Sequence, residues 1–255
     1  MRALAVLEYH LTGYRATWRG SLLGSFVLPV LYLLGFGLGV GHFVDAGGHL
    51  GQVSYLDFIV PGMLASTAMN LAFGESAWPV LSRFRWIRTY HSMVASPLRV
   101  VDLVSGALLY VLFRLVVTIS VFLGVTVAFG AVHSLWAITV PAVCALLGLA
   151  VAMPVHAFAA RVDIDSYFPL LMRFIVVPLG LFSAVYFPLS GLPLVVQRLA
   201  WVSPLWHAVE LCRAATLTGA GLSWTTVLGH LAYLGAWAGA GFWLAVRSFA
   251  SRLAV

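Results

Sequence analysis

Long apolar stretches, separated by short polar ones, run along the whole chain. A helix of about 20 mainly apolar residues is long enough to cross the hydrocarbon core of a bilayer. The pattern therefore predicts an all-α polytopic membrane protein with a single transmembrane domain over residues 1–255. Six spans are expected, over residues 21–41, 56–81, 101–130, 135–160, 168–189 and 224–246.

The first 20 residues have a different pattern. Leu4, Leu7, Leu11, Tyr14 and Trp18 recur at helical spacing, with charged residues between them. An amphipathic helix of this kind lies in the membrane interface, with its apolar face toward the lipid. We expect residues 1–20 to form such an interfacial helix.

Residues 83–99 form the polar segment between the second and third spans. They contain four arginines and no acidic residue, which keeps the segment outside the lipid. Two interpretations are open. The segment is either a short helix that presents aromatic and Met side chains to a partner's groove, or a plain positively charged loop with interfacial aromatics.

Residues 190–223 are apolar but interrupted by proline and glycine. These residues break regular helix, so the pattern does not favour one clean span. Short helices that dip into the interface, anchored by Trp201 and Trp206, fit the pattern better.

Composition excludes two classes of protein. Hydrophobic residues make up 62% of the chain and charged residues 9%, against roughly 45–50% and about 25% in soluble domains. The chain therefore lacks the polar surface of a soluble enzyme, and six spans leave no room for a second catalytic domain. All 14 basic residues are arginine. A P-loop requires a lysine, so the chain cannot hydrolyse ATP by that chemistry.

The arginines also predict an orientation. Eleven of the 14 fall on the side of the N-terminus when six spans are assumed. Positively charged segments stay in the cytoplasm, so both termini are expected there. Because the basic residues are spread between apolar runs, nucleic acid is not expected as a partner.

Glu75 and Arg114 are the clear ionisable residues deep inside the predicted spans. At about 1.5 Å per residue they lie roughly 12 and 22 Å from the cytoplasmic ends of their spans, so long side chains can meet. A structural ion pair is favoured over a functional role such as carrying a coupling ion.

Gly35, Gly37, Gly39 and Gly41 alternate in the first span. Their register does not match a dinucleotide-binding loop, which also requires a preceding strand. They instead form two small-xxx-small pairs that allow close helix approach, either within one chain or between two. The histidines match no strong zinc pattern, so no metal site is expected.

Several motifs follow one another along the spans: residues 29–39 (PVLYLLGFGLG), 54–63 (SYLDFIVPGM), 95–98 (ASPL), 186–189 (YFPL), 203–207 (SPLWH), Glu210 and Arg213. In this order they resemble the membrane subunits of ABC type-2 exporters. The resemblance is greatest to the group of the rhizobial nodulation-factor exporter permease and the daunorubicin-type drug exporter permeases. It covers nearly the whole chain.

The resemblance implies an N-terminal connecting helix, a cytoplasmic coupling helix between spans two and three, and extracellular re-entrant helices before span six. It assigns to the ATPase-coupling region the residues Arg88, Thr89, Tyr90, Met93, Ala95, Ser96 and Pro97. Arg83, Arg85 and Arg88 are expected to help seat the ATPase. The re-entrant region contains Trp201, Pro204, Trp206, His207, Glu210 and Arg213. Relatives more often have Thr at the position of Trp206, and the nodulation-type relatives also carry an acid where Glu75 lies.

The expected function is a permease subunit of an ATP-driven exporter in the bacterial cell membrane, and not an enzyme. Its cargo would be a hydrophobic or amphipathic molecule: a drug-like metabolite, a lipid or a lipo-oligosaccharide. The expected partners are two ABC ATPase subunits, a second copy of the chain or a related permease, and membrane lipids. ATP and Mg²⁺ would bind to the ATPase, and this chain would bind no cofactor. A polysaccharide exporter and, with less support, an ion-coupled secondary transporter remain alternatives.

Overall fold

The computed structural model describes residues 2–47, 54–217 and 222–253, and every regular element in these ranges is helical. Residue 1 of the predicted interfacial helix and residues 218–221 of the predicted 190–223 region lie outside the described residues. The α-helices are α1 (Arg2–Tyr32), α2 (Gly41–Ala46), α3 (Tyr55–Ser76), α4 (Trp78–Arg85), α5 (Thr89–Val94), α6 (Val100–Ala128), α7 (Val140–Ala159), α8 (Tyr167–Leu171), α9 (Val177–Phe182), α10 (Leu194–Val202), α11 (Pro204–Thr216) and α12 (Trp224–Leu253). Four shorter π and 3₁₀ elements lie among them: η1 (Leu33–Val40), η2 (Leu135–Thr139), η3 (Met172–Val176) and η4 (Leu189–Gly191).

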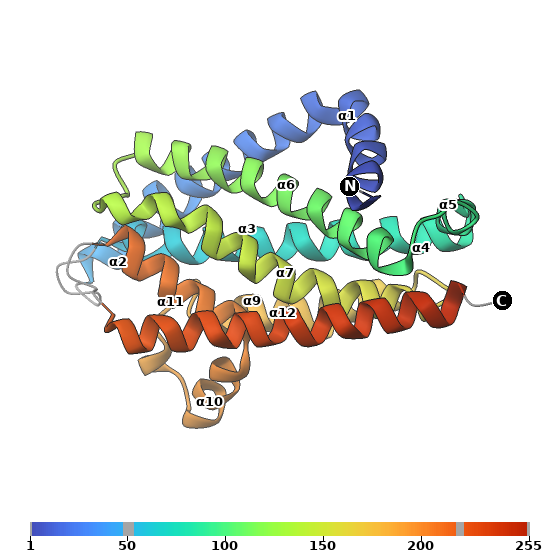
Figure 1. The fold of residues 1–255 in the computed structure, drawn as a ribbon. Helices are drawn as coiled ribbons and strands as arrows, with labels where there is room; N and C mark the ends of the chain where they lie inside the picture. The colour runs from blue at the N-terminus through green and yellow to red at the C-terminus, as the bar shows by residue number, and fades with distance from the viewer. Residues whose placement is uncertain (1, 48–53, 218–221, 254–255) are drawn as a thin grey trace.

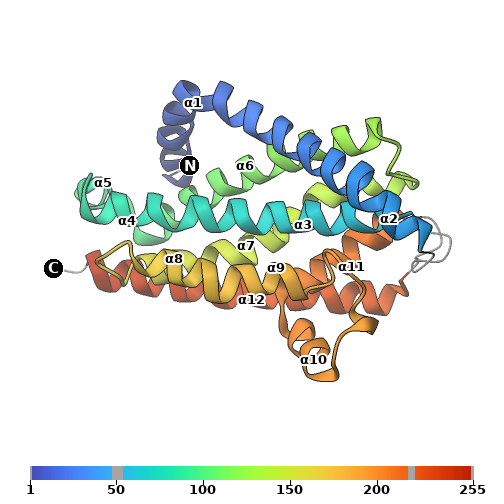
Figure 2. The ribbon, with the colours of Figure 1, turned by 180° about the vertical axis from the view of Figure 1, so that it is seen from behind.

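Among the described residues, four helical segments are long and apolar enough to cross a membrane: Leu23–Ala46, Tyr55–Arg85, Val100–Ala128 and Leu135–Ala159. The long helices run side by side along one axis (Figures 1 and 2). Helices α4 and α5 and the C-terminal end of α12 lie at one end of this bundle, α2 lies at the other, and the N-terminus lies beside α6, nearer the α4–α5 end. Helix α10 projects from the side of the bundle near α9 and α11.

Helix α1 contains both the predicted interfacial helix and the start of the first span without interruption. Its first part lies across the bundle, and its second part turns to run toward α2 (Figure 1). The first part packs on α6 at Gly106, where an added Cβ would lie 2.5 Å from Cβ of Val6 and 2.7 Å from the carbonyl oxygen of Ala3. Val6 is 1% exposed, so a residue without a side chain is required at this crossing.

The second predicted span, 56–81, is divided at Ala77. Helix α3 begins after Ser54, whose hydroxyl accepts a hydrogen bond from the backbone N–H of Asp57 at 3.1 Å. It ends at Ser76, because Ala77 has φ −83° and ψ −85°, outside helical geometry. Pro79 then lies in the first turn of α4, where its missing N–H costs no helical hydrogen bond. One residue therefore separates the buried α3 from α4.

The segment predicted to span 168–189 is shorter in the structure. Its helical part, 167–182, ends at Phe182, and Ala184 adopts a positive φ of 59°. Two contacts stabilise this end: Arg213 donates a hydrogen bond to the carbonyl oxygen of Ala184 at 2.8 Å, and the hydroxyl of Ser183 donates to that of Ser203 at 2.8 Å. Helix α12, in contrast, continues seven residues beyond the predicted end at 246.

Candidate functional site

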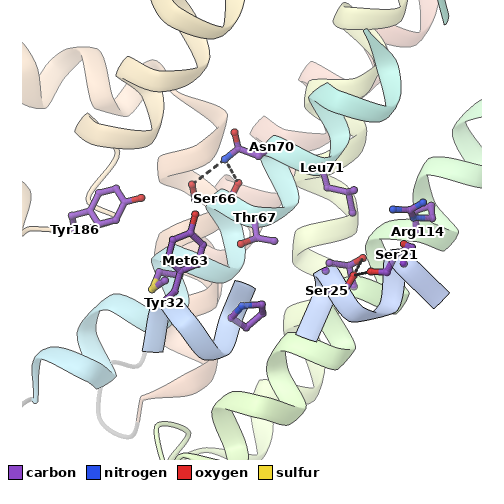
Figure 3. A pocket seen from close by; sticks show the side chains of 14 residues that line it. Ser21, Ser25, Tyr32, Met63, Ser66, Thr67, Asn70, Leu71, Arg114 and Tyr186 are labelled. Atoms are coloured by element: carbon purple, nitrogen blue, oxygen red, sulfur yellow. Dashed lines mark hydrogen bonds between the residues drawn. The ribbon is translucent and has the colours of Figure 1, made fainter. Parts of the chain in front are cut away.

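A polar pocket of about 540 Å³ lies between α1, α3 and α6 (Figure 3). It is lined by Gly20, Ser21, Gly24, Ser25, Pro29, Tyr32, Met63, Ser66, Thr67, Asn70, Leu71, Arg114, Thr118 and Tyr186. A volume in this range suits a ligand or part of one. Hydroxyl, amide and guanidinium groups are costly to expose to lipid, so their concentration in one pocket indicates a polar interior.

Asn70 is the most unusual of these residues. Its amide nitrogen donates to the carbonyl oxygen of Ser66 at 2.8 Å, within the same helix, and lies 3.5 Å from the hydroxyl of Ser66 (Figure 3). These contacts involve only the NH₂ group, and the side chain is exposed although its neighbours Ala68 and Met69 are buried. The amide oxygen is therefore available to a ligand in the pocket.

A hydroxyl contact joins two walls of the pocket. The hydroxyl oxygens of Ser25 in α1 and Thr118 in α6 lie 3.1 Å apart, and Ser25 also donates to the carbonyl oxygen of Ser21 at 2.9 Å. These small polar side chains hold α1 against α6 without filling the space between them.

The structure brings Glu75 and Arg114 together. A guanidinium nitrogen of Arg114 lies 3.2 Å from a carboxylate oxygen of Glu75, and the two side chains are 14% and 18% exposed. The guanidinium carbon also lies 5.1 Å from the ring centre of Tyr14 in α1. Arg114 lines the pocket, and its charge is balanced by Glu75, so the pocket carries little net charge.

Aromatic rings lie near the α2 end of the pocket. Tyr32 and Phe36 have ring centres 6.3 Å apart, and those of Phe36 and Tyr186 are 5.7 Å apart. Tyr55 donates a long hydrogen bond of 3.4 Å to the carbonyl oxygen of Tyr186, which links this segment to α3. An aromatic face beside hydroxyl and amide groups suits a ligand with both apolar and polar surface.

An apolar pocket of about 280 Å³ lies against a different face of α3. Met69 and Phe73 of α3 line it together with Pro154 and Phe158 of α7 and Trp237 of α12, among others. One face of α3 therefore borders a pocket lined by both polar and apolar groups, and another face borders a pocket that is almost entirely apolar.

The predicted coupling region forms an exposed surface at the end of the bundle, in the turn between α4 and α5 (Figure 2). Trp86 and Ile87 are 61% and 65% exposed, and Arg88 holds a left-handed conformation with φ 56°. The exposed residues of the predicted set are Arg85, Arg88, Ala95, Ser96 and Pro97, whereas Arg83, Thr89 and Met93 are half-buried.

Tyr90 differs from the other residues of this set. It is completely buried, against Phe84 of the same segment and Phe249 of α12. Its side chain therefore belongs to the chain's own core, and Trp86 and Ile87 offer the exposed apolar groups instead.

The alternating glycines divide into two faces. A Cβ on Gly37 would lie 2.7 Å from Leu56, and one on Gly41 would contact Tyr55, so this pair allows α3 to approach within the chain. Gly35 and Gly39 have no heavy atom of the described residues within 4 Å of an added Cβ.

The residues of the predicted re-entrant region make contacts with one another and with α12. Ring nitrogens of His207 and His230 lie 2.7 Å apart, and the other ring nitrogen of His207 lies 2.9 Å from the carbonyl oxygen of Trp201. Glu210 pairs with Arg213, at 2.9 Å. The ring centres of Trp201 and Trp206 are 6.4 Å apart, and Pro204 is buried at the start of α11.

Sequence reasoning missed the polar wall of the pocket on α3. Its signal was present: Ser66, Thr67 and Asn70 interrupt an apolar run at positions that share one helical face. Within the described ranges, no three His, Cys, Asp or Glu side chains are grouped to hold a metal ion.

The chain is similar to known proteins over most of its length. Residues 4–217 match the ABC-2 type transporter family. The chain is 32% identical to nodulation protein J of Rhizobium leguminosarum bv. trifolii over 217 residues, which are 84% of this chain and 80% of that protein. It is 30% identical to nodulation protein J of Sinorhizobium fredii (strain NBRC 101917 / NGR234) over 230 residues, 85% of this chain and 86% of the relative.

Proposed function

The chain belongs to the ABC-2 type transporter family, and we propose that it is the permease subunit that moves a lipo-oligosaccharide out of the bacterial cytoplasm. Members of this family are membrane subunits that work with a separate ABC ATPase, so the chain is a transport component and not an enzyme. In this proposal ATP and Mg²⁺ bind to that partner.

The polar pocket carries the proposal. A sugar residue presents hydroxyl groups that both donate and accept hydrogen bonds, and Ser66, Thr67 and Asn70 supply matching groups. Tyr32 and Tyr186 add aromatic surface for the less polar faces of a sugar ring. Pairing of Arg114 with Glu75 favours an uncharged polar ligand over an anion.

The apolar pocket on the other face of α3 supports an amphipathic cargo. Its lining of Met, Phe, Pro and Trp side chains suits an acyl chain, which the polar pocket does not. A drug-like cargo would need mainly the apolar surface.

We propose six spans, with the Tyr167–Phe182 segment and α12 as the fifth and sixth. At about 1.5 Å per residue these 16 and 30 residues measure roughly 24 and 45 Å, so the fifth would only just cross and the sixth would extend beyond the membrane. An even number of spans, and two termini that lie nearer the α4–α5 end than the α2 end, support two cytoplasmic termini (Figure 1). The working unit would contain two permeases, identical or related, and two ATPase subunits, which contact the surface around Trp86, Ile87 and Arg88.

The test is transport in inside-out vesicles that contain the chain and its ABC ATPase. We expect ATP-dependent uptake of an N-acylated oligosaccharide. We expect no uptake when the Walker-A lysine of the ATPase is replaced, so that the ATPase cannot hydrolyse ATP. Preference for a long unacylated polysaccharide would favour a polysaccharide exporter. Uptake driven by an ion gradient without ATP would contradict the proposal and favour a secondary transporter, although pairing of Glu75 with Arg114 leaves no free intramembrane acid at this position to carry an ion.

A further inference from the structure

Three buried aromatic rings join α4 and α5 to the end of α12. The ring centres of Phe84 and Tyr90, and those of Phe84 and Phe249, are both 4.8 Å apart, and those of Tyr90 and Phe249 are 5.2 Å apart. All three side chains are at most 2% exposed. Helices of eight and six residues are not stable alone. Packing on Phe249 therefore helps to hold α4 and α5 in place.

A cluster of hydrogen-bonded charged side chains lies beside the same rings. Asp163, in the link between α7 and α8, accepts hydrogen bonds from Arg252 at 3.0 Å and from Arg85 at 3.4 Å. Arg252 also donates to the carbonyl oxygens of Ala160 and Val162, at 3.1 and 2.6 Å.

Arg252 is the centre of this cluster. Its guanidinium carbon lies 5.1 Å from the ring centre of Phe84, and its side chain is only 17% exposed. Asp163 and Arg85 are 67% and 52% exposed, so the ion pair between them contributes little by itself. The buried rings and the hydrogen bonds of Arg252 provide most of the attachment.

Helix α12, to which α4 and α5 are attached, lines the apolar pocket together with α7. Helix α12 packs closely on α7, because a Cβ on Gly241 would lie 2.7 Å from Pro154. Pro154 of α7 and Trp237 of α12 both line that pocket. A displacement of α12 at Phe249 therefore reaches the pocket through two rigid helices.

We propose that Phe249 and Arg252 are positioning residues that transmit movement of the α4–α5 surface to α12 and α7. The inference rests on the proposed function, since that surface would receive the ATPase. In this arrangement the ATPase moves two walls of the apolar pocket at once: α3, through α4, which follows it after the single residue Ala77, and the α7–α12 pair, through Phe249 and Arg252. An attachment to α3 alone would leave the apolar pocket's other wall unmoved.

The experiment uses the full chain assembled with its ABC ATPase in vesicles, with Phe249→Leu and Arg252→Met as test variants. Phe242→Leu is the matched control, because Phe242 lies two helical turns earlier on α12 and is only partly buried. The readouts are the amount of ATPase bound, the rate of ATP hydrolysis and the number of cargo molecules transported per ATP. Asp163→Asn is compared with Asp165→Asn, whose carboxylate makes no ion pair with the described residues.

We expect both test variants to bind the ATPase and hydrolyse ATP at near wild-type rates, with transport per ATP at least about fivefold lower, at the lower end of typical coupling effects. Asp163→Asn should have a smaller effect, and both controls none. Unchanged transport per ATP in Phe249→Leu and Arg252→Met would overturn the inference, as would parallel losses of ATPase binding and transport. Absence of ATP-dependent transport in the wild type would instead contradict the proposed function. If one variant does not fold, the other provides the same comparison.

Discussion

Arg114 of α6 and Glu75 of α3 form an ion pair of 3.2 Å inside the helix bundle, where each side chain is less than a fifth exposed. A charge removed from water is tolerated when its partner and hydrogen bonds offset the lost hydration. The pair joins α3 to α6 at the edge of the polar pocket, so its loss should affect both folding and the charge of the pocket.

Replacing Arg114 with Leu should leave the carboxylate of Glu75 buried and unpaired. Breaking a buried pair in this way costs about 3–5 kcal/mol, and removing both charges together costs less. We expect Arg114→Leu to lower the melting temperature in detergent clearly, and the double variant Glu75→Leu, Arg114→Leu to recover part of the loss. Val116→Leu, on the exposed side of α6, is the control. Equal melting of Arg114→Leu and Val116→Leu would show that the pair does not stabilise the fold.

Asn70→Leu tests the polar pocket. The loss of one uncharged hydrogen bond to cargo weakens binding by about 0.5–1.5 kcal/mol, or roughly twofold to twelvefold. We therefore expect the KM for an acylated oligosaccharide to rise within this range, while ATP hydrolysis without cargo is unchanged. Ser120→Leu, an exposed position on α6 that does not line the pocket, controls for the added apolar side chain. The same KM in both variants and the wild type would exclude Asn70 from the binding site.

The same substitution at two glycines of α6 should have opposite effects on stability. Gly106→Ala would force the backbone of Ala3 and the side chain of Val6 away, at a cost of about 1–3 kcal/mol. Gly124→Ala has open space around its Cβ and should be neutral, or stabilise the helix by up to about 1 kcal/mol. Thermal unfolding of the two variants measures the difference directly. If Gly106→Ala is as stable as Gly124→Ala, or more stable, the first part of α1 does not pack on α6.

His10 makes the docking of α1 sensitive to acid. Its ring stacks on Tyr110 at 5.3 Å and is 5% exposed. Burial, then the charge of Arg83 and the neighbouring His156, lower the pKa of His10 from 6.5 to about 3. Since the docked state binds the proton less readily, His10 contributes full stability above pH 6.5, and this contribution is lost as the pH falls toward 3.

At pH 5 this loss amounts to about 2 kcal/mol for a ring with these two pKa values. Melting temperatures at pH 7.5 and pH 5 measure it. His10→Phe should reduce the difference between the two pH values, whereas His91→Phe, at an exposed position, should preserve it. An equal pH dependence in wild type and His10→Phe would locate the acid sensitivity elsewhere.

The features that were predicted best from the sequence are those that the apolar environment of the membrane determines. The all-α class is confirmed for the described residues, because backbone groups in lipid must be satisfied within each helix. The meeting of Glu75 and Arg114 has the same cause: two opposite charges in apolar runs at similar depth have few other partners.

Features that depend on tertiary contact were not predictable in the same way. Asn70 bonds to the backbone of its own helix, as Ser, Thr and Asn commonly do, so only packing decides that it faces a pocket. Asp163 and Arg252 are 89 residues apart, and no local pattern relates them. The end of α9 at Phe182 is stabilised by Arg213, which supplies the donor for the carbonyl of Ala184.

Ala77 separates the wall of the polar pocket from the exposed turn at Trp86 by a single non-helical residue. Because only one residue lies between the two helices, α4 can change its angle to α3 but cannot move away from it along the axis. In the proposed function, a displacement of Trp86 by the ATPase would therefore reach Asn70 as a change of tilt and not of depth. A cargo group held by Asn70 would then be turned and not pulled along the helix axis.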